Sequence, residues 1–318
     1  MFKKIYQLVN KTYFNKSYNF QKKNIVFFYE IGCFLQKKKF NIFADLMFSI
    51  PYLIFSIFNM RSLDFNQVCY LFNTDKSREE FSLADNYERY FFKIRNQKLK
   101  ILEIGIGGHN QSHLGGSSLR AFQKYFKKSN IFGIDISDKN LHSRPRIKVF
   151  KGSQIDKEFL KKIVELNGPF DIIIDDGSHY VAHQIFSFKF LFEHLKNKGI
   201  YIIEDTLSAY MKYMGGSTNI DDKQNLITLF SKYAHNVHSD VIFPEEIKKL
   251  DKEVKISSIQ FYNRNDRACI IMEKLNTKKD SEVALRNPHF KNTSEEISKL
   301  YPNNKHNRKS KEGTISSE

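Results

Sequence analysis

Two short apolar runs in the middle of the chain end in acidic residues. The first, FDIIIDDGSH, carries Asp175, Asp176 and His179, and the second, GIYIIED, carries Glu204 and Asp205. If both runs are neighbouring parallel strands, four carboxylates and an imidazole meet at one sheet edge, where open α/β sheets bind ligands. Carboxylate oxygens are ligands that Mg²⁺ prefers, and an imidazole can act as a general base. The pattern therefore predicts a metal site with a base beside it.

Within this group we expect Asp176, Glu204 and Asp205 to bind the metal, which could be magnesium, manganese or calcium. His179, three residues after Asp176, is the expected base. Asp175 should point to the other side of its strand and contact the metal ligands rather than the metal. A plainer alternative stays open, because acids at strand ends also cap helices and a loop histidine is often only solvated.

A glycine-rich turn follows an earlier predicted strand. In ILEIGIGGHN, Gly105, Gly107 and Gly108 permit the tight turn that brings backbone close to a ligand. The spacing is not GxGxxG, because a His-Asn pair stands where the dinucleotide fingerprint has its last glycine. Asp135 closes the next predicted strand, where a carboxylate can accept hydrogen bonds from both hydroxyls of a ribose. Together these residues indicate a cofactor that contains a ribose.

A mostly parallel sheet would position these residues. From residue 100 onward, short apolar runs alternate with helical segments, as in a parallel sheet with right-handed crossovers. The predicted parallel strands are KILEIGI, NIFGIDI, IKVFKG, FDIIIDD and GIYIIED. Helices are predicted over 117–126, 156–166, 181–196 and 222–234. The run KISSIQFYNRNDRACIIMEK predicts two more strands around a turn at 263–266, so the sheet should end in an antiparallel pair.

The chain divides into three predicted regions. Residues 1–69 form a helical, basic and aromatic appendage, residues 70–275 form the α/β domain, and residues 276–318 form a polar tail that we expect to be disordered. A helix is expected beside the domain at its start. There Asp75 and Lys76 are expected to cap the helix or lie in solvent, with closure over a ligand as the alternative.

The motifs of the α/β domain resemble those of class I S-adenosylmethionine-dependent methyltransferases. The resemblance is closest to the metal-dependent sugar O-methyltransferases of the mycinamicin type, and it extends from Tyr70 to Lys274. It implies a Rossmann-like fold with a seven-stranded sheet. The motifs that carry it are LEIGIGGH, GGSSLR, GIDI, GSQID, PFDIIIDDGSH and YIIED.

The resemblance also implies roles for individual residues. The matching positions in that family imply that Asp176, Glu204 and Asp205 bind the metal and that His179 is the base. Magnesium would lower the pKa of a sugar hydroxyl and the base would remove its proton. Six residues are implied to bind the cofactor: Glu103, Gly105 and Gly107 around methionine and ribose, Asp135 at the ribose, and Ser153 and Gln154 near adenine.

These observations predict an S-adenosylmethionine-dependent, magnesium-assisted O-methyltransferase. Its acceptor would be a sugar with vicinal hydroxyls, in a glycosylated metabolite or in a polysaccharide precursor. One alternative is an NAD-dependent oxidoreductase on a similar sheet, and the missing GxGxxG argues against it. The other is a non-catalytic methyltransferase-like binding domain, and the complete set of acids and histidine argues against that.

Composition limits the partners and the location. The net charge is +16, with lysines concentrated near both ends of the chain and acids in the middle. No RNA-recognition motif, zinc-finger spacing or arginine-rich helix is present, which argues against a nucleic-acid partner. The three cysteines lie far apart with no CxxC, which argues against a disulfide framework or zinc site and favours the cytoplasm.

The segment 42–58 is apolar and follows three consecutive lysines. Asp45 and Pro51 interrupt it, and both are costly within a bilayer, so we expect a buried helical hairpin or an interfacial helix rather than a span. The N-terminus also lacks the pattern of a secretory signal. We therefore expect a cytoplasmic protein, with peripheral contact to the inner face of the membrane through residues 1–60. The oligomeric state stays open.

Overall fold

The computed structural model describes residues 18–58, 63–77, 83–222, 225–238, 254–264 and 267–275. A seven-stranded sheet forms its centre, in the order β3-β2-β1-β4-β5-β7-β6. Strands β1 to β5 are parallel, and β7 runs antiparallel to both β5 and β6. Five parallel strands and an antiparallel pair were predicted, and both are confirmed. The strands are β1 (Lys100–Ile104), β2 (Asn130–Asp135), β3 (Ile147–Lys151), β4 (Phe170–Asp175), β5 (Leu195–Ile203), β6 (Ile256–Arg264) and β7 (Arg267–Lys274).

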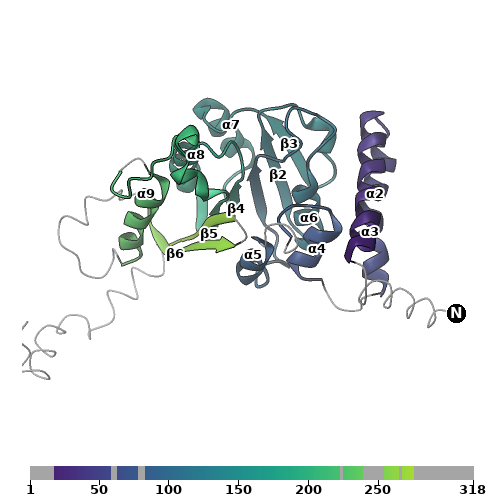
Figure 1. Cartoon of the computed structure of the whole chain (residues 1–318), viewed down its shortest axis with the longest axis horizontal. Coiled ribbons are helices and arrows are strands. Elements are labelled where there is room, and N and C mark those ends of the chain that lie inside the picture. The colour runs from purple at the N-terminus through teal and green to yellow at the C-terminus, as the bar shows by residue number, and fades with distance from the viewer. Residues whose placement is uncertain are drawn as a thin grey trace, which may run out of the picture.

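Helices cover both faces of this sheet (Figure 1). Side chains alternate along each strand, so Ile200 and Ile202 of β5 join one core cluster, while Tyr201 and Ile203 join the other. Strands buried on both faces read as continuous apolar runs, which is why these runs were recognisable. One face carries α4 (Phe65–Leu71), α5 (Leu83–Phe91) and α6 (Ser117–Tyr125), and the other carries α7 (Lys157–Asn167), α8 (Val181–Glu193) and α9 (Leu226–Tyr233).

The helical segment before the sheet differs from the prediction. The expected appendage boundary at residue 69 falls within α4, whose Phe65 is fully buried between the rings of Tyr87 and Phe122. After α4 the chain does not continue as a helix, because Asn73 adopts a left-handed backbone conformation with φ 52°. The resulting loop carries Lys76. The predicted tail at 276–318 lies outside the described residues.

Helices α2 (Tyr18–Lys37) and α3 (Asn41–Phe58) form a hairpin beside α4 and α6 (Figure 1). Gln36 donates a hydrogen bond to the carbonyl oxygen of Leu141 at 2.7 Å, and the Arg120 guanidinium lies 4.0 Å from the centre of the Phe48 ring. The expected hairpin within 42–58 is wrong, because this segment is one continuous helix with Pro51 inside it. Its burial is only partial, since Ile42 is 84% exposed, and its placement at a membrane interface stays a prediction. No helix in the described ranges is long and apolar enough to span a membrane.

Candidate active site

The carboxyl ends of β1, β4 and β5 lie side by side. The backbone N–H of Asp176 donates to the carbonyl oxygen of Ile104 at 2.9 Å, and that of Glu204 donates to the carbonyl oxygen of Asp175 at 2.9 Å. Parallel pairing of β4 with β5 thus places the two acidic motifs next to each other. The acids meet at one sheet edge, as the sequence predicts.

Three of the predicted site residues form a group that can hold a metal ion. Asp176, His179 and Asp205 offer ligand atoms that all lie within 4.8 Å of one another. The Nε2 atom of His179 is 3.4 Å from Oδ2 of Asp205. His179 has a φ of 59°, an uncommon conformation for a residue other than glycine, and the loop therefore turns sharply where the ring meets Asp205. Two hard oxygen donors and an imidazole fit a divalent metal.

Glu204 lies deeper than these three residues. Its Oε1 atom accepts hydrogen bonds from the Lys76 ammonium at 2.7 Å and from the Tyr87 hydroxyl at 2.5 Å. The same ammonium lies 2.7 Å from Oδ2 of Asp176 and 3.5 Å from Oε1 of Glu103. Glu204 therefore belongs to a buried cluster in which Lys76 lies among three acids.

The favoured prediction that Lys76 is solvated or caps a helix is wrong. Its side chain is only 2% exposed, and a buried ammonium requires compensating charge, which the three carboxylates supply. Burial alone would lower the pKa of Lys76, but the carboxylates of Asp176, Glu204 and Glu103 raise it above its ordinary value. The ammonium is therefore a permanent charge at this edge of the sheet.

The carboxyl group of Glu103 is fully buried at the end of β1. Burial raises its pKa to about 7. Its Oε2 atom accepts a hydrogen bond from the Ser118 hydroxyl at 2.6 Å. Its Oε1 atom has no hydrogen-bond partner among the described residues, beyond the ion pair with Lys76. A buried oxygen without a hydrogen bond beside the glycine turn fits a ligand that carries an ammonium or another donor.

The glycine turn packs directly against the loop that follows β4. Gly105 has a φ of 77°, and a Cβ atom at this position would clash with the carbonyl oxygen of Asp176. Gly107, with a φ of 74°, has more space around it. The Asp135 carboxylate supports the same turn by accepting from the backbone N–H of Ile106 at 3.2 Å, and it also accepts from the N–H of Ser137 in its own loop at 2.8 Å. The glycine turn therefore contacts the loop after β4, which also carries Asp176 of the metal group.

Gln154 connects β3 with β4 through its buried side-chain amide. The amide donates to both carboxylate oxygens of Asp175 at 3.2 Å and accepts from the backbone N–H of Ser178 at 2.8 Å. Asp175 also accepts from the Ser187 hydroxyl, so it points toward α8 and away from the metal group, as expected. The neighbouring Ser153 hydroxyl accepts from the backbone N–H of Ile155 at 3.3 Å. Contact of Ser153 and Gln154 with adenine stays a prediction.

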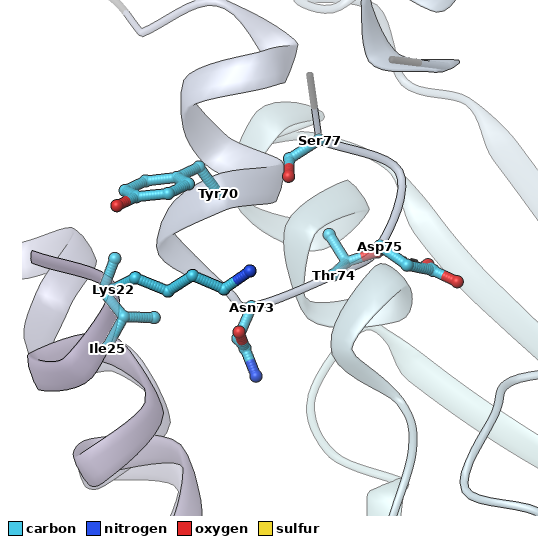
Figure 2. A pocket seen from close by; sticks show the side chains of 7 residues that line it. All are labelled: Lys22, Ile25, Tyr70, Asn73, Thr74, Asp75 and Ser77. Atoms are coloured by element: carbon cyan, nitrogen blue, oxygen red, sulfur yellow. Dashed lines mark hydrogen bonds between the residues drawn. The ribbon is translucent and has the colours of Figure 1, made fainter. Parts of the chain in front are cut away.

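A small cavity borders the loop that carries Lys76 (Figure 2). Its volume is about 200 Å³. The loop contributes Asn73, Thr74, Asp75 and Ser77 to its wall, and Lys22 and Ile25 of α2 line the opposite side. Open space therefore borders the loop directly.

Comparison with known proteins gives sequence relatives with stated activities. No protein-family model matches the chain. The mycinamicin VI 2''-O-methyltransferase of Micromonospora griseorubida is 45% identical over 134 residues, which are 42% of this chain and 34% of the relative. The demethylmacrocin O-methyltransferase of Streptomyces fradiae is 38% identical over 156 residues, 49% of this chain and 40% of that protein.

A solved structure extends the comparison to the fold. The MycE methyltransferase of the mycinamycin biosynthetic pathway, in complex with Mg, SAH and mycinamycin VI, superposes with a TM-score of 0.62. It is 31% identical, and the match covers 70% of this chain and 56% of that one. This chain has the class I methyltransferase fold and is related to the macrolide sugar O-methyltransferases. It spans about a third of the length of the first curated relative, 34%, and just over half of the solved one.

Sequence reasoning missed three residues of this candidate site. Lys76 stands in a polar segment that gives no sign of burial, and Tyr87 belongs to an amphipathic helix in which core packing was the obvious role. Arg267, at the start of β7, forms an ion pair with Asp205. Only the strand order, which inserts β7 beside β5, brings this arginine to the acid.

Proposed function

We propose that this chain is an S-adenosylmethionine-dependent O-methyltransferase that acts on a sugar hydroxyl of a glycosylated compound. The observation that carries the proposal is the grouping of Asp176, His179 and Asp205 at the sheet edge next to the glycine turn. The activities of the relatives and the Mg and SAH of the MycE complex support it. A sugar with vicinal hydroxyls is the acceptor class that suits a divalent metal.

In this proposal the residues divide into a cofactor side and an acceptor side. S-adenosylmethionine would supply the methyl group, and a divalent metal such as Mg²⁺ would lower the pKa of the acceptor hydroxyl. On the cofactor side, Glu103, whose Oε1 atom has no hydrogen bond, would accept from the methionine ammonium, and Asp135 would accept from the ribose hydroxyls. Asp176, Glu204 and Asp205 would hold the metal.

His179 is the proposed general base on the acceptor side. Its Nε2 atom faces Asp205, whose carboxylate stabilises the imidazolium that forms when the ring accepts the hydroxyl proton. The Nδ1 atom of His179 is buried with no hydrogen-bond partner among the described residues. His179 can then take the proton from the same acceptor oxygen that receives the methyl group from a cofactor bound at the glycine turn.

The test is a calorimetric titration of S-adenosylmethionine into the purified protein, with and without Mg²⁺, and with NAD in parallel. We expect S-adenosylmethionine to bind and NAD not to bind. A panel of glycosylated macrolides and free sugars, assayed with metal and with excess chelator, then tests the transfer. Binding of NAD alone would favour the oxidoreductase alternative, and cofactor binding without transfer to any sugar would favour a non-catalytic domain.

We also propose peripheral contact between the α2–α3 turn and an anionic membrane. Exposed apolar groups next to cations bind such surfaces, because the apolar groups enter the interface and the cations meet lipid phosphates. Sedimentation with vesicles should show binding to phosphatidylglycerol but not to pure phosphatidylcholine, and I42S should weaken it. Equal sedimentation with both lipids would contradict this contact. The exposed apolar and basic side chains of the turn are Phe34, Lys37, Lys38, Lys39, Phe40, Ile42 and Phe43.

A further inference from the structure

The buried ammonium of Lys76 lies where two of the expected metal ligands meet. It is 2.7 Å from Oδ2 of Asp176 and 2.7 Å from Oε1 of Glu204, and it also pairs with Glu103. We propose that Lys76 is an internal cation that competes with the divalent metal for Asp176 and Glu204, so that metal binds when the ammonium leaves them. This inference rests on the proposed function, because it assumes that a metal uses this edge of the sheet.

The competition follows from the contacts of the carboxylates. A metal such as Mg²⁺ binds carboxylate oxygens at about 2.0–2.1 Å and demands near-ideal geometry. One oxygen of Asp176 and one of Glu204 already accept hydrogen bonds from the Lys76 ammonium. A divalent ion inserted beside that ammonium would also meet its positive charge at short range in a buried site, where repulsion between cations is strong.

The burial of the acids explains why some cation must be present. Glu204 is 3% exposed at its side chain and Glu103 is fully buried. Buried carboxylates without a counter-charge are strongly destabilising, so the cluster needs either the ammonium or a metal. Lys76 thus neutralises the carboxylates of the cluster while no metal is bound. Because the same ion pairs must break before metal binds, they lower the apparent affinity for the metal.

The surroundings of Lys76 allow it to leave the carboxylates. Its side chain is an unbranched four-carbon stem with a single terminal charge, which can change rotamer without moving a rigid group. The loop that carries it borders the cavity of about 200 Å³, which Asn73, Thr74, Asp75 and Ser77 line (Figure 2). The loop therefore has open space beside it into which it can move.

The rival interpretation is a purely structural ion pair. In that case Lys76 would keep its contacts when metal binds, and the metal would use only Asp176, His179 and Asp205. The two interpretations predict different metal affinities when Lys76 is replaced, because only competition makes the lysine an obstacle to the metal.

The experiment is a calorimetric titration of MgCl₂ into the full chain and into K76M. Competition predicts that the dissociation constant for Mg²⁺ falls by about tenfold or more in K76M, since a competing charge is removed from two ligands. K76R keeps the charge and should show no gain. K139M is the matched control, because Lys139 is also buried but donates to the carbonyl oxygens of Gln111 and Leu114 instead of to acids.

If K76M is poorly folded without metal, the shift of its melting temperature on addition of Mg²⁺ provides a second measurement. Competition predicts that Mg²⁺ raises the melting temperature of K76M more than that of the wild type, because metal replaces the missing ammonium. Wild-type affinity in K76M, together with an equal melting shift, would overturn the role of Lys76 and leave the proposed function intact. Absence of Mg²⁺ binding in both proteins would overturn the metal role as well.

Discussion

The ammonium of Lys76 lies 2.7 Å from Oε1 of Glu204, although 128 positions separate the two residues in the chain. The contact joins the loop after α4 to the carboxyl end of β5. Tyr87 of α5 donates to the same oxygen. The helices that precede the sheet are therefore part of the site, and a domain that began at β1 would leave Glu204 without either partner.

The H179A variant tests the proposed base. We expect the turnover number to fall by about 10²–10⁴-fold, since a general base contributes that range, while the affinity for S-adenosylmethionine stays near the wild-type value. Single-turnover transfer rates and cofactor titrations measure the two quantities. H194A, at the end of α8, is the matched control and should keep full activity. Retention of turnover in H179A would show that another group removes the proton.

The G105A variant tests the contact between the glycine turn and the loop after β4. A Cβ atom at residue 105 meets the carbonyl oxygen of Asp176, so the loop must move. Gly215 provides the control, because it has a nearly identical φ of 75° with no atom within 4 Å of its Cβ position. G215A should therefore cost only the backbone strain of about 1–2 kcal/mol.

We expect G105A to lose about 2 kcal/mol more than G215A and to bind both Mg²⁺ and S-adenosylmethionine more weakly. Urea unfolding and calorimetry on the two variants measure the difference. Equal losses in both variants would mean that the turn tolerates a side chain and that the two binding regions are not coupled through Gly105.

The Y87F variant tests the phenolic hydrogen bond to Glu204. Tyr87 is fully buried, and removal of its hydroxyl leaves Lys76 as the remaining partner of that oxygen. We expect a loss of about 1–3 kcal/mol in the free energy of unfolding, since the bond involves a charged acceptor. Y90F is the control, because the Tyr90 hydroxyl is 3.5 Å from that of Tyr262 and less buried. A smaller loss in Y87F than in Y90F would contradict this assignment.

His142 should make stability depend on pH below neutrality. Burial lowers its pKa to about 3, and the charges of Arg120 and Arg144 act in the same direction. Its Nδ1 atom lies 3.3 Å from Nε2 of Gln36 and its Nε2 atom 3.1 Å from the carbonyl oxygen of Leu114, which suits the neutral ring. The unfolded chain takes up this proton near pH 6.5 and the folded chain does not.

The contribution of His142 is therefore complete above about pH 6.5 and is lost as pH falls toward about 3, at about 1.4 kcal/mol per pH unit. The H142Q variant, which keeps one donor and one acceptor, should lose this slope between pH 6 and about 4. Urea unfolding at several pH values measures it. H235Q, at an exposed position, should keep the wild-type slope. An unchanged slope in H142Q would refute the assignment.

The parts of the site that were predictable are those encoded in strand periodicity. Asp176 and Glu204 end apolar runs, so their meeting at one edge follows from parallel pairing alone. Lys76 was not predictable in this way, because its burial depends on three acids that lie far along the chain. The hydrogen bonds of Gln154 to Asp175 and Ser178 were not predictable either, and its expected contact with adenine stays a prediction.

The α2–α3 segment was predictable as helical, but not in its turn or its packing. The turn lies at the lysine run, between a helix that ends at Lys37 and one that begins at Asn41. Which face docks depends on Gln36 and Asp45, which contact Leu141 and Arg144 in the loop between β2 and β3. Polar contacts between distant segments produce no hydrophobic periodicity, so they cannot be predicted from the sequence pattern.

The position of β7 between β5 and β6 affects how the protein is made. A ribosome completes β5 more than sixty residues before it reaches β7, since β5 ends at Ile203 and β7 begins at Arg267. Until then the edge of β5 stays unpaired, and Asp205 lacks Arg267. Over this interval the nascent chain therefore carries an open edge of β5, and the ion pair between Arg267 and Asp205 forms only when β7 emerges and inserts.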